Sequence, residues 1–574
     1  MKSSKEDILR IMSNERLKLT TVSGILTTRP AMIRWVDDNI DIDMITTKSY
    51  QVRPNRGNRE PIIVEESMGN FGNAVGLRNP GMEKGFDELY RMLEREGLRA
   101  ILNISLSADN IEDYITLVKR FGSIADILEL NFSCPHAKKG FGATIGSSPG
   151  LVKEYITGIR KHTDALLFPK LTPDVDDIGE IAYSAIKAGA DGISAINTAQ
   201  PKRFTEPTSG RAVLYNPAGQ KGGRSGTDIN GLALRCIRDI RQSVGNDVPI
   251  IGIGGVSSGE DARRMREAGA DVVGLGSVLA RVDSQERLPQ FVEAIRKDAE
   301  TGSEDSDVFL EKRRLAQYIP FSISEMKQKS DNQTLMVLDG KMEYEASQFA
   351  FIWHPDLGEK PFSIARSDPL TFLIREKGKF TKGLIRLKEG EKVMVRGVYG
   401  KAPHLDESTG DAYVIAGGTG IAIVPRLVEE LSGHKKNIIV YHGITSRQES
   451  CFKEEISRFA HYIPVEDDDV KARVIDVFKE DLDIEDIGGA SFYNIGPPGF
   501  MEIATRTERD AGADAKDIHL SLETNCMCGI GLCGECECGG KLVCKEGTMF
   551  TLEYLEKQNI WMDGLQDDHG HQYR

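Results

Sequence analysis

The sequence predicts an α/β protein: an N-terminal (β/α)8 TIM barrel, then a small antiparallel β-barrel, an α/β nucleotide-binding domain and a [2Fe–2S] domain. Three observations support this. Short apolar strands alternate with amphipathic helices over about the first 300 residues, short alternating runs replace them from residue 333, and six of the nine cysteines crowd into residues 526–544. A chain of 574 residues is also too long for one ordinary core.

The predicted domains follow these changes of pattern, and the polar, acidic stretch AETGSEDSD (299–307) marks the linker region. Their bounds are 1–300 for the (β/α)8 barrel, 301–312 for the linker, 313–405 for the antiparallel β-barrel, 406–512 for the α/β nucleotide-binding domain, and 513–574 for the cysteine-rich domain and tail.

Seven apolar runs in the first domain are predicted strands. Stretches such as 178–190 and 259–270 lie between them, have helical periodicity and end in glycine, a common helix stop. Strands and helices that alternate over this length favour a parallel sheet, and a (β/α)8 barrel fits best. The strands are 42–47, 100–106, 126–131, 166–171, 191–196, 249–254 and 271–276.

The composition, 40% hydrophobic and 28% charged, is that of a globular protein, and no stretch approaches the roughly 20 apolar residues of a membrane-spanning helix. The charged N-terminus is not a secretory signal. A net charge of −14 argues against nucleic acid or an anionic membrane as the main partner. Unevenly spaced cysteines argue against a disulfide framework, so we expect a reducing, cytoplasmic location.

The cysteine-rich segment predicts a [2Fe–2S] cluster. Cys528, Cys533 and Cys536 have the spacing C-x4-C-x2-C, and Cys544 supplies a fourth thiolate, as in plant-type clusters. The alternative is a structural zinc site, although zinc ligands usually come as two short cysteine pairs and not as one wrapped loop. Cys526 and Cys538 are then spare thiols that pack nearby.

The second half also carries nucleotide-binding signals. The strand AYVIA runs into Gly417, Gly418, Thr419 and Gly420 and then into a helix, a turn that lets a pyrophosphate approach the backbone. Alone this turn is weak evidence for nucleotide binding, because glycine-rich turns between a strand and a helix also occur as plain structural turns. KPFSIA (360–365) and GKFT (378–381) precede it, and Gly496 and Pro497 follow a later strand.

This ordered set resembles the ferredoxin-reductase-like electron-transfer subunit of class 1B dihydroorotate dehydrogenases, over about 310–550. The resemblance implies a cluster beside FAD, and a nicotinamide as electron acceptor. Lys360 replaces the arginine of the family's R-P-x-S stretch, which keeps the charge but loses the planar fork. Ser446 and Arg447 could contact a 2′-phosphate, so NADP stays open beside NAD; a solvated loop is the alternative for Arg447. The implied FAD residues are Lys360, Pro361, Phe362, Ser363, Gly378 and Thr381, and the implied NAD residues are Gly417, Gly418, Thr419, Gly420, Gly496 and Pro497.

Polar and glycine residues follow the predicted barrel strands, where barrel enzymes bind ligands. Gly254 with Gly255, and Gly276 with Ser277, end the last two strands and together suggest an FMN phosphate site. The stretch NFSCPH (131–136) offers Asn131 as an amide partner and Cys134 as a general base. Inert packing is the alternative for a lone cysteine. Further polar residues at strand ends are Lys48, Lys170, Asn197 and Thr198.

The barrel residues resemble the catalytic subunit of class 1 dihydroorotate dehydrogenases, across about 18–295. The match includes Thr47-Lys48-Ser49, NAVGLRNPG (73–81), NFSCPH, PKLTP, INT and GGRSG (222–226). The resemblance implies that Cys134 removes the C5 proton of dihydroorotate while hydride leaves C6 for flavin N5. Asn73, Asn131, Asn197 and Thr198 would bind the pyrimidine amides, and Lys48 with the backbone N–H groups of Val75, Gly76 and Leu77 would bind the carboxylate. The implied FMN residues are Ser23, Lys48, Ser49, Asn103, Asn131, Lys170, Ile196, Gly226, Gly254, Gly255, Gly276 and Ser277.

One departure bears on the substrate. The family usually reads NxSCPN, and His136 gives the NxSCPH form that also occurs in dihydropyrimidine dehydrogenases, which reduce uracil and thymine. Those enzymes carry an acidic residue where this chain has Val75, and an apolar valine does not repel the orotate carboxylate. We therefore expect orotate chemistry, with an NAD(P)H-dependent pyrimidine reductase as the alternative and a non-catalytic pyrimidine-binding module as a second.

The two halves complement each other. Electrons are expected to pass from dihydroorotate to FMN, the [2Fe–2S] cluster, FAD and then NAD, since flavins exchange one or two electrons. The resembled subunits are separate chains, whereas this one chain resembles both, so we expect a fusion that forms a homodimer through the barrels. The tail 567–574 contains two histidines, which are more often disordered than metal ligands.

Overall fold

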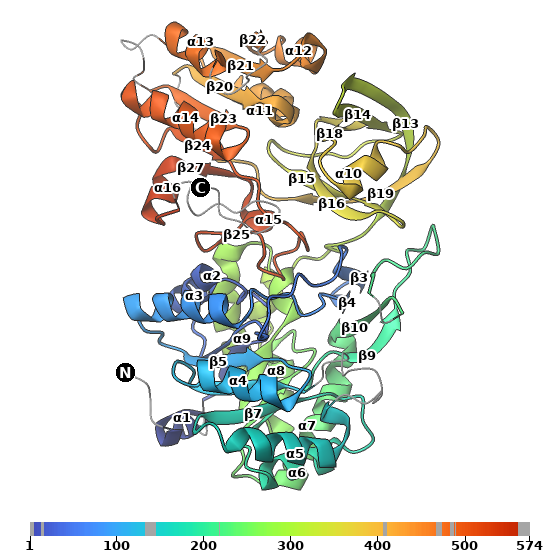
Figure 1. The fold of residues 1–574 in the computed structure, drawn as a ribbon, viewed down its shortest axis with the longest axis vertical. Helices are drawn as coiled ribbons and strands as arrows, with labels where there is room; N and C mark the ends of the chain where they lie inside the picture. Colours follow the sequence, from blue (N-terminus) through green and yellow to red (C-terminus); the bar gives the residue numbers. More distant parts are fainter. Residues whose placement is uncertain are drawn as a thin grey trace. The chain divides into compact units, whose positions relative to one another are not determined.

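The computed structural model describes residues 5–12, 16–132, 145–216, 219–405, 410–466, 473–482, 487 and 489–560. The chain forms two compact units (Figure 1). The first comprises Met1–Leu315 with Ile530–Gly534, and the second Ala316–Gly529 with Glu535–Arg574. No helix in these described ranges is both long and apolar enough to cross a membrane.

A closed barrel of eight parallel strands forms the centre of the first unit, in the order β1-β12-β11-β8-β7-β6-β5-β2. The predicted barrel is confirmed, and each of the seven predicted strands overlaps an observed one. The eighth strand, β1, has the sequence KLTT and was not predicted. The bounds are β1 Lys18–Thr21, β2 Met44–Thr46, β5 Ile101–Leu106, β6 Ile127–Asn131, β7 Leu166–Leu171, β8 Ile193–Ala195, β11 Ile250–Ile253 and β12 Val272–Leu275.

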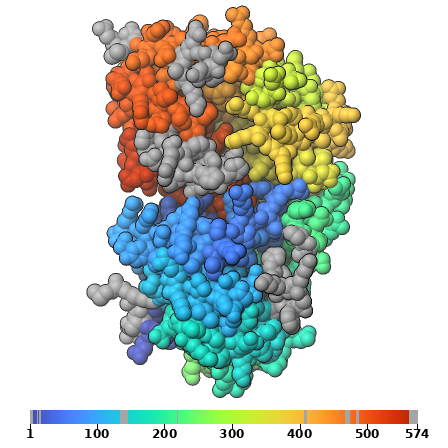
Figure 2. Space-filling view, viewed as in Figure 1, coloured from blue at the N-terminus to red at the C-terminus, as the bar shows by residue number. Residues whose placement is uncertain are grey.

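Helices cover the outside of this barrel (Figure 1), and the segment from α3 to α6 forms much of the first unit's surface on the face shown in Figure 2. Several begin with a side-chain cap that satisfies a backbone N–H, such as Asn110 on α4, Asp177 on α6 and Ser258 on α8. The bounds are α1 Lys5–Met12, α2 Pro30–Asn39, α3 Met82–Arg95, α4 Ile111–Phe121, α5 Pro149–Arg160, α6 Ile178–Lys187, α7 Asn230–Val244, α8 Gly259–Glu267 and α9 Leu288–Thr301. The stretch predicted as a linker, 301–312, lies within the first unit and contains the short 3-10 helix Asp305–Phe309.

A small antiparallel sheet accompanies the barrel, in the order β3-β4-β10-β9, and was not predicted. Its strands are β3 Ile63–Ser67, β4 Asn70–Asn73, β9 Ala199–Arg203 and β10 Lys221–Gly226. Because β4 pairs with β10, this sheet places Asn73 opposite Gly223.

The second unit contains a seven-stranded antiparallel sheet and a six-stranded, mainly parallel sheet, ordered β16-β15-β19-β13-β14-β18-β17 and β22-β21-β20-β23-β24-β27. The seven-stranded sheet lies in the region predicted to be an antiparallel β-barrel, and the six-stranded sheet begins in the region predicted to be an α/β domain. The strands of the first are β13 Ile319–Ser330, β14 Gln333–Leu338, β15 Phe349–His354, β16 Gly358–Ser363, β17 Arg366–Ser367, β18 Leu370–Arg375 and β19 Lys392–Tyr399, with helix α10 Lys379–Leu384. The second has β20 Ala412–Gly417, β21 Ile438–Ile444, β22 His461–Glu466, β23 Ser491–Ile495, β24 Ile518–Ser521 and β27 Met549–Thr551, with α11 Val424–Leu431, α12 Lys453–Ile456, α13 Arg473–Asp481 and α14 Pro498–Asp510. The remaining elements are β25 Glu537–Cys538, β26 Lys541–Leu542, α15 Val543–Glu546 and α16 Leu552–Lys557.

Helix α14 in the second unit carries a buried carboxyl group, Glu508. Glu508 is fully buried, and its Oε2 accepts a hydrogen bond of 2.8 Å from Asn494 Nδ2 on β23. Its other oxygen, Oε1, has no hydrogen-bond partner among the described residues. Burial raises the pKa of Glu508 to about 8, so the folded protein holds this group protonated at neutral pH.

We predict that Glu508→Gln stabilises the protein increasingly as the pH rises from 5 to 8. The folded pKa lies above the ordinary value of 4.5, so the favourable protonated state is complete at low pH and is lost as the pH rises through about 8. The difference in unfolding free energy should reach on the order of 3 kcal/mol near pH 7. Urea unfolding followed by circular dichroism at several pH values measures it. Glu502→Gln on the same helix is the control, and parallel pH curves for Glu508→Gln and wild type would contradict the prediction.

Candidate functional site

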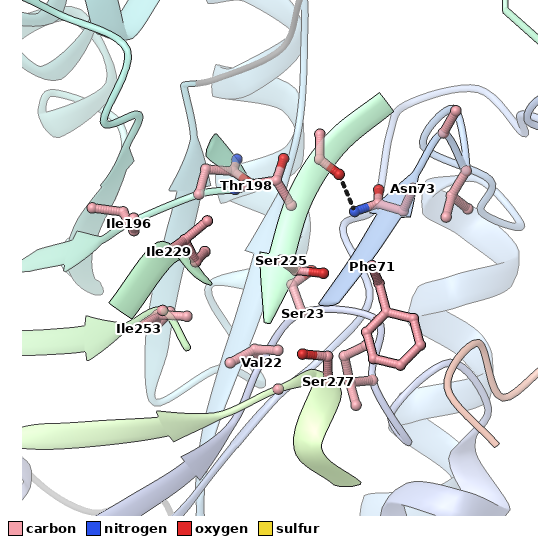
Figure 3. Close-up of a pocket in the computed structure, with 18 of the residues that line it drawn as sticks. Val22, Ser23, Phe71, Asn73, Ile196, Thr198, Ser225, Ile229, Ile253 and Ser277 are labelled. Carbon is pink, nitrogen blue, oxygen red and sulfur yellow. Dashed lines mark hydrogen bonds between the residues drawn. The ribbon is translucent and has the colours of Figure 1, made fainter. Parts of the chain in front are cut away.

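A cavity of about 730 Å³ opens at the carboxyl ends of the barrel strands. Every described residue predicted to bind substrate or FMN lines it, with the exception of Asn103. The lining includes Ser23, Lys48, Ser49, Asn73, Val75, Gly76, Leu77, Asn131, Lys170, Ile196, Asn197, Thr198, Gly226, Gly254, Gly255, Gly276 and Ser277, several of which Figure 3 shows. The structure thus brings the predicted set together, while the role of each residue stays a prediction.

Two lysines give the cavity wall a positive character. Lys48 and Lys170 are only 9% and 6% exposed. A Cβ atom at Gly24, whose φ is +78°, would lie 3.1 Å from Lys48 Cδ. A glycine at this position therefore leaves room for the Lys48 side chain. Lys170 Nζ lies 3.6 Å from a carboxylate oxygen of Glu129. A largely desolvated ammonium group such as that of Lys48 favours an anionic ligand, whereas the Glu129 carboxylate offsets the charge of Lys170.

The polar residues that end β6 and follow β8 form one hydrogen-bonded group. Asn197 Oδ1 accepts from the Thr198 N–H at 2.8 Å, so Asn197 Nδ2 is the donor to Asn131 Oδ1 at 3.1 Å. The backbone of Asn131 is held in turn by Tyr114, whose hydroxyl donates to its carbonyl oxygen. Fixed amide orientations of this kind suit a ring with its own amide groups.

The loop after β4 is held by a residue that the sequence analysis missed. Asn58 donates from its backbone N–H to Val75 O and from its side chain to Ala74 O, at 3.0 and 2.9 Å. Gly76 and Leu77 both have positive φ values, +75° and +55°. A Cβ atom at Gly76 would lie 2.7 Å from the Asn58 side chain, so glycine is required there. Asn58 lies 11 residues beyond the end of the predicted strand 42–47, and no local pattern marks it as part of the site.

Asn73 reaches the cavity from the end of β4. Its Nδ2 donates to the backbone carbonyl of Gly223 at 3.3 Å (Figure 3). This bond exists because the unpredicted sheet pairs β4 with β10. The pairing therefore positions one of the residues predicted to bind the pyrimidine.

The glycine turn after β11 has the geometry of a phosphate cradle. Gly254 and Gly255 have φ values of +137° and +70°, and a Cβ atom at Gly255 would lie 2.7 Å from Gly226 O. Asn103, set back from the wall, is fully buried and donates to Thr46 Oγ1, but its Oδ1 has no partner among the described residues. A glycine backbone that lines the cavity and an unsatisfied buried acceptor both fit a bound polar group such as FMN.

The predicted catalytic residue, Cys134, and His136 fall in 133–144, outside the described residues. The described chain ends there at Phe132, directly after Asn131 at the end of β6. The role of Cys134 stays a prediction from the sequence.

The predicted FAD residues lie on the antiparallel sheet of the second unit. Lys360, Pro361, Phe362 and Ser363 belong to β16. Gly378 precedes α10, and Thr381 Oγ1 accepts from the Gly378 N–H at 3.0 Å, so this hydroxyl also caps the helix.

The two predicted NAD turns meet at neighbouring strands. β20, which ends at Gly417, pairs with β23, and a Cβ atom at Gly420 would lie 2.9 Å from Ile495 O. His442 supports the first turn: its Nε2 lies 3.0 Å from Gly418 O and its Nδ1 lies 2.8 Å from the Tyr462 hydroxyl. Burial lowers the pKa of His442 to about 4, so the ring is neutral and Nε2 carries the hydrogen that Gly418 O accepts.

The region considered for a 2′-phosphate is already engaged locally. Ser446 Oγ accepts from the Gln448 N–H, and Arg447 forms an ion pair of 3.2 Å with Glu466. The Arg447 side chain is 91% exposed, which agrees with the solvated-loop interpretation.

Three of the four predicted cluster ligands gather in the second unit. The Cys544 thiol shares hydrogen bonds with Cys528 and Cys536, and these bonds, with burial, raise the pKa of Cys544 well above its usual range. Cys526, predicted as a spare thiol nearby, is hydrogen-bonded to Cys536. Cys533 belongs to Ile530–Gly534 in the first unit. No three His, Cys, Asp or Glu side chains of the described ranges are arranged to hold a metal ion, so the cluster stays a prediction.

The first part of the chain is similar to proteins of one known family. A family model described as dihydroorotate dehydrogenase matches residues 18–294. The chain is 40% identical over 236 residues to the dihydroorotate dehydrogenase B (NAD(+)) catalytic subunit of Methanocaldococcus jannaschii, which covers 41% of this chain and 74% of the relative. Proteins with the same name from Pyrococcus abyssi and Alkaliphilus metalliredigens are 36% and 37% identical, over 46% and 45% of this chain and 83% and 82% of theirs.

For the cysteine group, we predict about two iron atoms and two acid-labile sulfides per chain of protein purified without oxygen. Cys528→Ser and Cys544→Ser should each lower both contents at least severalfold, because each removes a thiolate ligand. Metal and sulfide analysis measures this, and Cys451→Ser, a buried free cysteine of the same unit, is the control. Zinc without sulfide would favour the structural zinc site instead.

Proposed function

The chain belongs to the dihydroorotate dehydrogenase family and is an oxidoreductase, and from that premise we propose that it oxidises dihydroorotate to orotate and reduces NAD. The balanced reaction converts dihydroorotate and NAD⁺ into orotate, NADH and one proton. The observation that carries the proposal is the cavity at the barrel's carboxyl rim, where two buried lysines face the same space as Asn131, Asn197 and Thr198.

The substrate's own chemistry matches this lining. Dihydroorotate carries a carboxylate, for which Lys48 and the loop Val75–Leu77 supply positive charge and backbone donors. It also carries ring amides, for which Asn131 and Asn197 supply paired donors and acceptors. Each group of the substrate therefore has a partner of suitable chemistry in one cavity.

The reaction needs a base and a hydride acceptor. Cys134 would take the C5 proton, as the family resemblance implies; it follows Asn131, the last residue of β6, by three positions in the sequence. FMN, held by Lys170, Ser49 and the turn at Gly254 and Gly255, would supply the two-electron acceptor for the C6 hydride.

We propose that the second unit delivers the electrons to NAD through a [2Fe–2S] cluster and FAD. The gathered thiols of Cys528, Cys536 and Cys544 and the paired turns at Gly417 and Gly496 support this. A homodimer through the barrels is the proposed assembly, which a mass measurement in solution can test.

The main alternative is a reductase of uracil or thymine, which His136 suggests. Val75 argues against it, because an acidic residue is expected at that position in such enzymes and an apolar one is compatible with a carboxylate. A non-catalytic pyrimidine-binding module is the other alternative. If that were correct, replacement of Cys134 by alanine would change nothing.

We predict that dihydroorotate bleaches the flavin absorbance of the oxidised protein within seconds under anaerobic conditions, and that NADH forms when NAD is added. Stopped-flow absorbance measures both steps. Bleaching without NADH would indicate NADP or another acceptor. Bleaching by dihydrouracil and not by dihydroorotate would overturn the proposal in favour of the pyrimidine reductase.

We predict that Lys48→Met raises the KM for dihydroorotate roughly 10- to 100-fold, because a charge-assisted hydrogen bond to the carboxylate is lost. Steady-state kinetics measure the effect, with FMN content determined in parallel because Lys48 is also expected to contact the flavin. Lys119→Met, on the exposed face of α4, is the control. An unchanged KM at full FMN content would remove Lys48 from the carboxylate site.

A further inference from the structure

The side chain of Glu129 places a carboxylate inside the barrel, behind the cavity wall. Glu129, on β6, is 0% exposed. Its Oε2 accepts from Ser194 Oγ at 2.8 Å, its Oε1 accepts from Ser105 Oγ at 3.1 Å, and Lys170 Nζ lies 3.6 Å from the same Oε1. Strands of a closed parallel barrel are usually apolar on both faces, and a buried carboxylate is expensive unless it is paired. Its presence in the interior calls for an explanation other than packing.

The serines next to Glu129 form a chain that leads to the cavity. Ser105 Oγ lies 2.9 Å from Ser49 Oγ, which lies 3.2 Å from Ser23 Oγ. Ser49 and Ser23 both line the cavity. Glu129 is therefore linked to the wall at two places, through these hydroxyls and through Lys170.

The charge of Glu129 fixes the direction of this chain. An ionised carboxylate only accepts, so Ser105 gives its single hydrogen to Glu129. The contact between Ser105 and Ser49 then needs Ser49 as its donor, and the contact between Ser49 and Ser23 needs Ser23. All three hydroxyl hydrogens point away from the cavity, so Ser23 and Ser49 present oxygen lone pairs to a ligand.

We infer that Glu129 is a positioning residue for the bound flavin: it makes the wall an acceptor at Ser23 and Ser49, and it holds and neutralises the cation at Lys170. The inference deepens the proposed function and rests on FMN binding in this cavity. A ligand with N–H or O–H donors on one side and electron-rich atoms on another fits such a wall. A purely structural ion pair would leave the properties of the flavin unchanged when the charge is removed.

The test uses the full-length holoenzyme with Glu129→Gln, which keeps the shape but removes the charge. Lys170 then loses its counter-charge, and a net positive charge near the flavin favours its electron-rich, reduced form. At a fixed ratio of dihydroorotate to orotate, the ratio of reduced to oxidised FMN in the fast bleaching phase should rise about tenfold. Glu129→Asp, which keeps the charge, should restore that ratio to within about threefold of wild type, a rescue that a size effect alone would not give.

Ser105→Ala tests the hydroxyl chain separately from the ion pair with Lys170. It also replaces Glu129→Gln as the test variant if that protein fails to fold. It interrupts the hydroxyl chain but leaves the pair of Glu129 and Lys170, so the redox ratio should stay near wild type while the FMN dissociation constant rises severalfold. Ser194→Ala, which contacts Glu129 outside the chain, is the matched control and should change neither. FMN fluorescence on release and the bleaching amplitude measure these quantities.

The outcomes distinguish this inference from the proposed function. A wild-type protein that binds no FMN, or is not bleached by dihydroorotate, overturns both. A wild-type protein that is bleached, with unchanged redox ratio in Glu129→Gln and unchanged FMN affinity in Ser105→Ala, overturns the role of Glu129 alone.

Discussion

The backbone hydrogen bonds that close the barrel, between β1 and its neighbours β12 and β2, determine where the site residues at the ends of the barrel strands can lie. Because the eight strands are parallel and the sheet has no free edge, all their carboxyl ends reach one rim. Side chains separated by more than 200 residues, such as Lys48 and Ser277, therefore line one cavity. Polar contacts support the seam, where Asp43 accepts from the Leu19 N–H and pairs with Lys18 and Arg296.

The same closure explains why polar residues inside the barrel carry so much of the proposed chemistry. A closed interior excludes water, so each buried charge must find its partner within the protein. Glu129 has two serines and Lys170, which leaves the ammonium at the wall and the carboxylate behind it. A charge arranged in this way acts on a ligand at lower dielectric than a surface charge, so loss of the Glu129 charge can alter the properties of the cavity.

Much of the barrel was predictable because its strands are apolar runs between amphipathic helices, and site residues at strand ends followed from the geometry of such barrels. Strand β1 was missed because KLTT reads as polar, although Lys18 is buried against Asp43. Asn58 and the sheet β3-β4-β10-β9 were missed because they act through long-range pairing, which has no local pattern. Glu129 was read only as part of a strand, since its meaning comes from Ser105 and Ser194 on two other strands.

In the second unit, side-chain hydrogen bonds link strand β16, which carries the predicted FAD stretch, to the backbone of the cysteine group. Glu359 precedes Lys360 on β16 and forms a buried two-bonded ion pair with Arg396, at 2.7 and 2.6 Å. Arg396 Nη1 also donates to the carbonyl oxygen of Cys528, at 2.8 Å, and its guanidinium lies over the ring of Phe351. A planar, permanently charged fork can hold a carboxylate and a loop carbonyl together, whereas a lysine could not do both with fixed geometry. Because the carboxylate shares its strand with Lys360–Ser363, a shift of β16 would move the Cys528 backbone with it. Electron transfer depends steeply on the separation of its centres, so this shared anchor would hold the proposed FAD site and the proposed cluster site at a fixed separation.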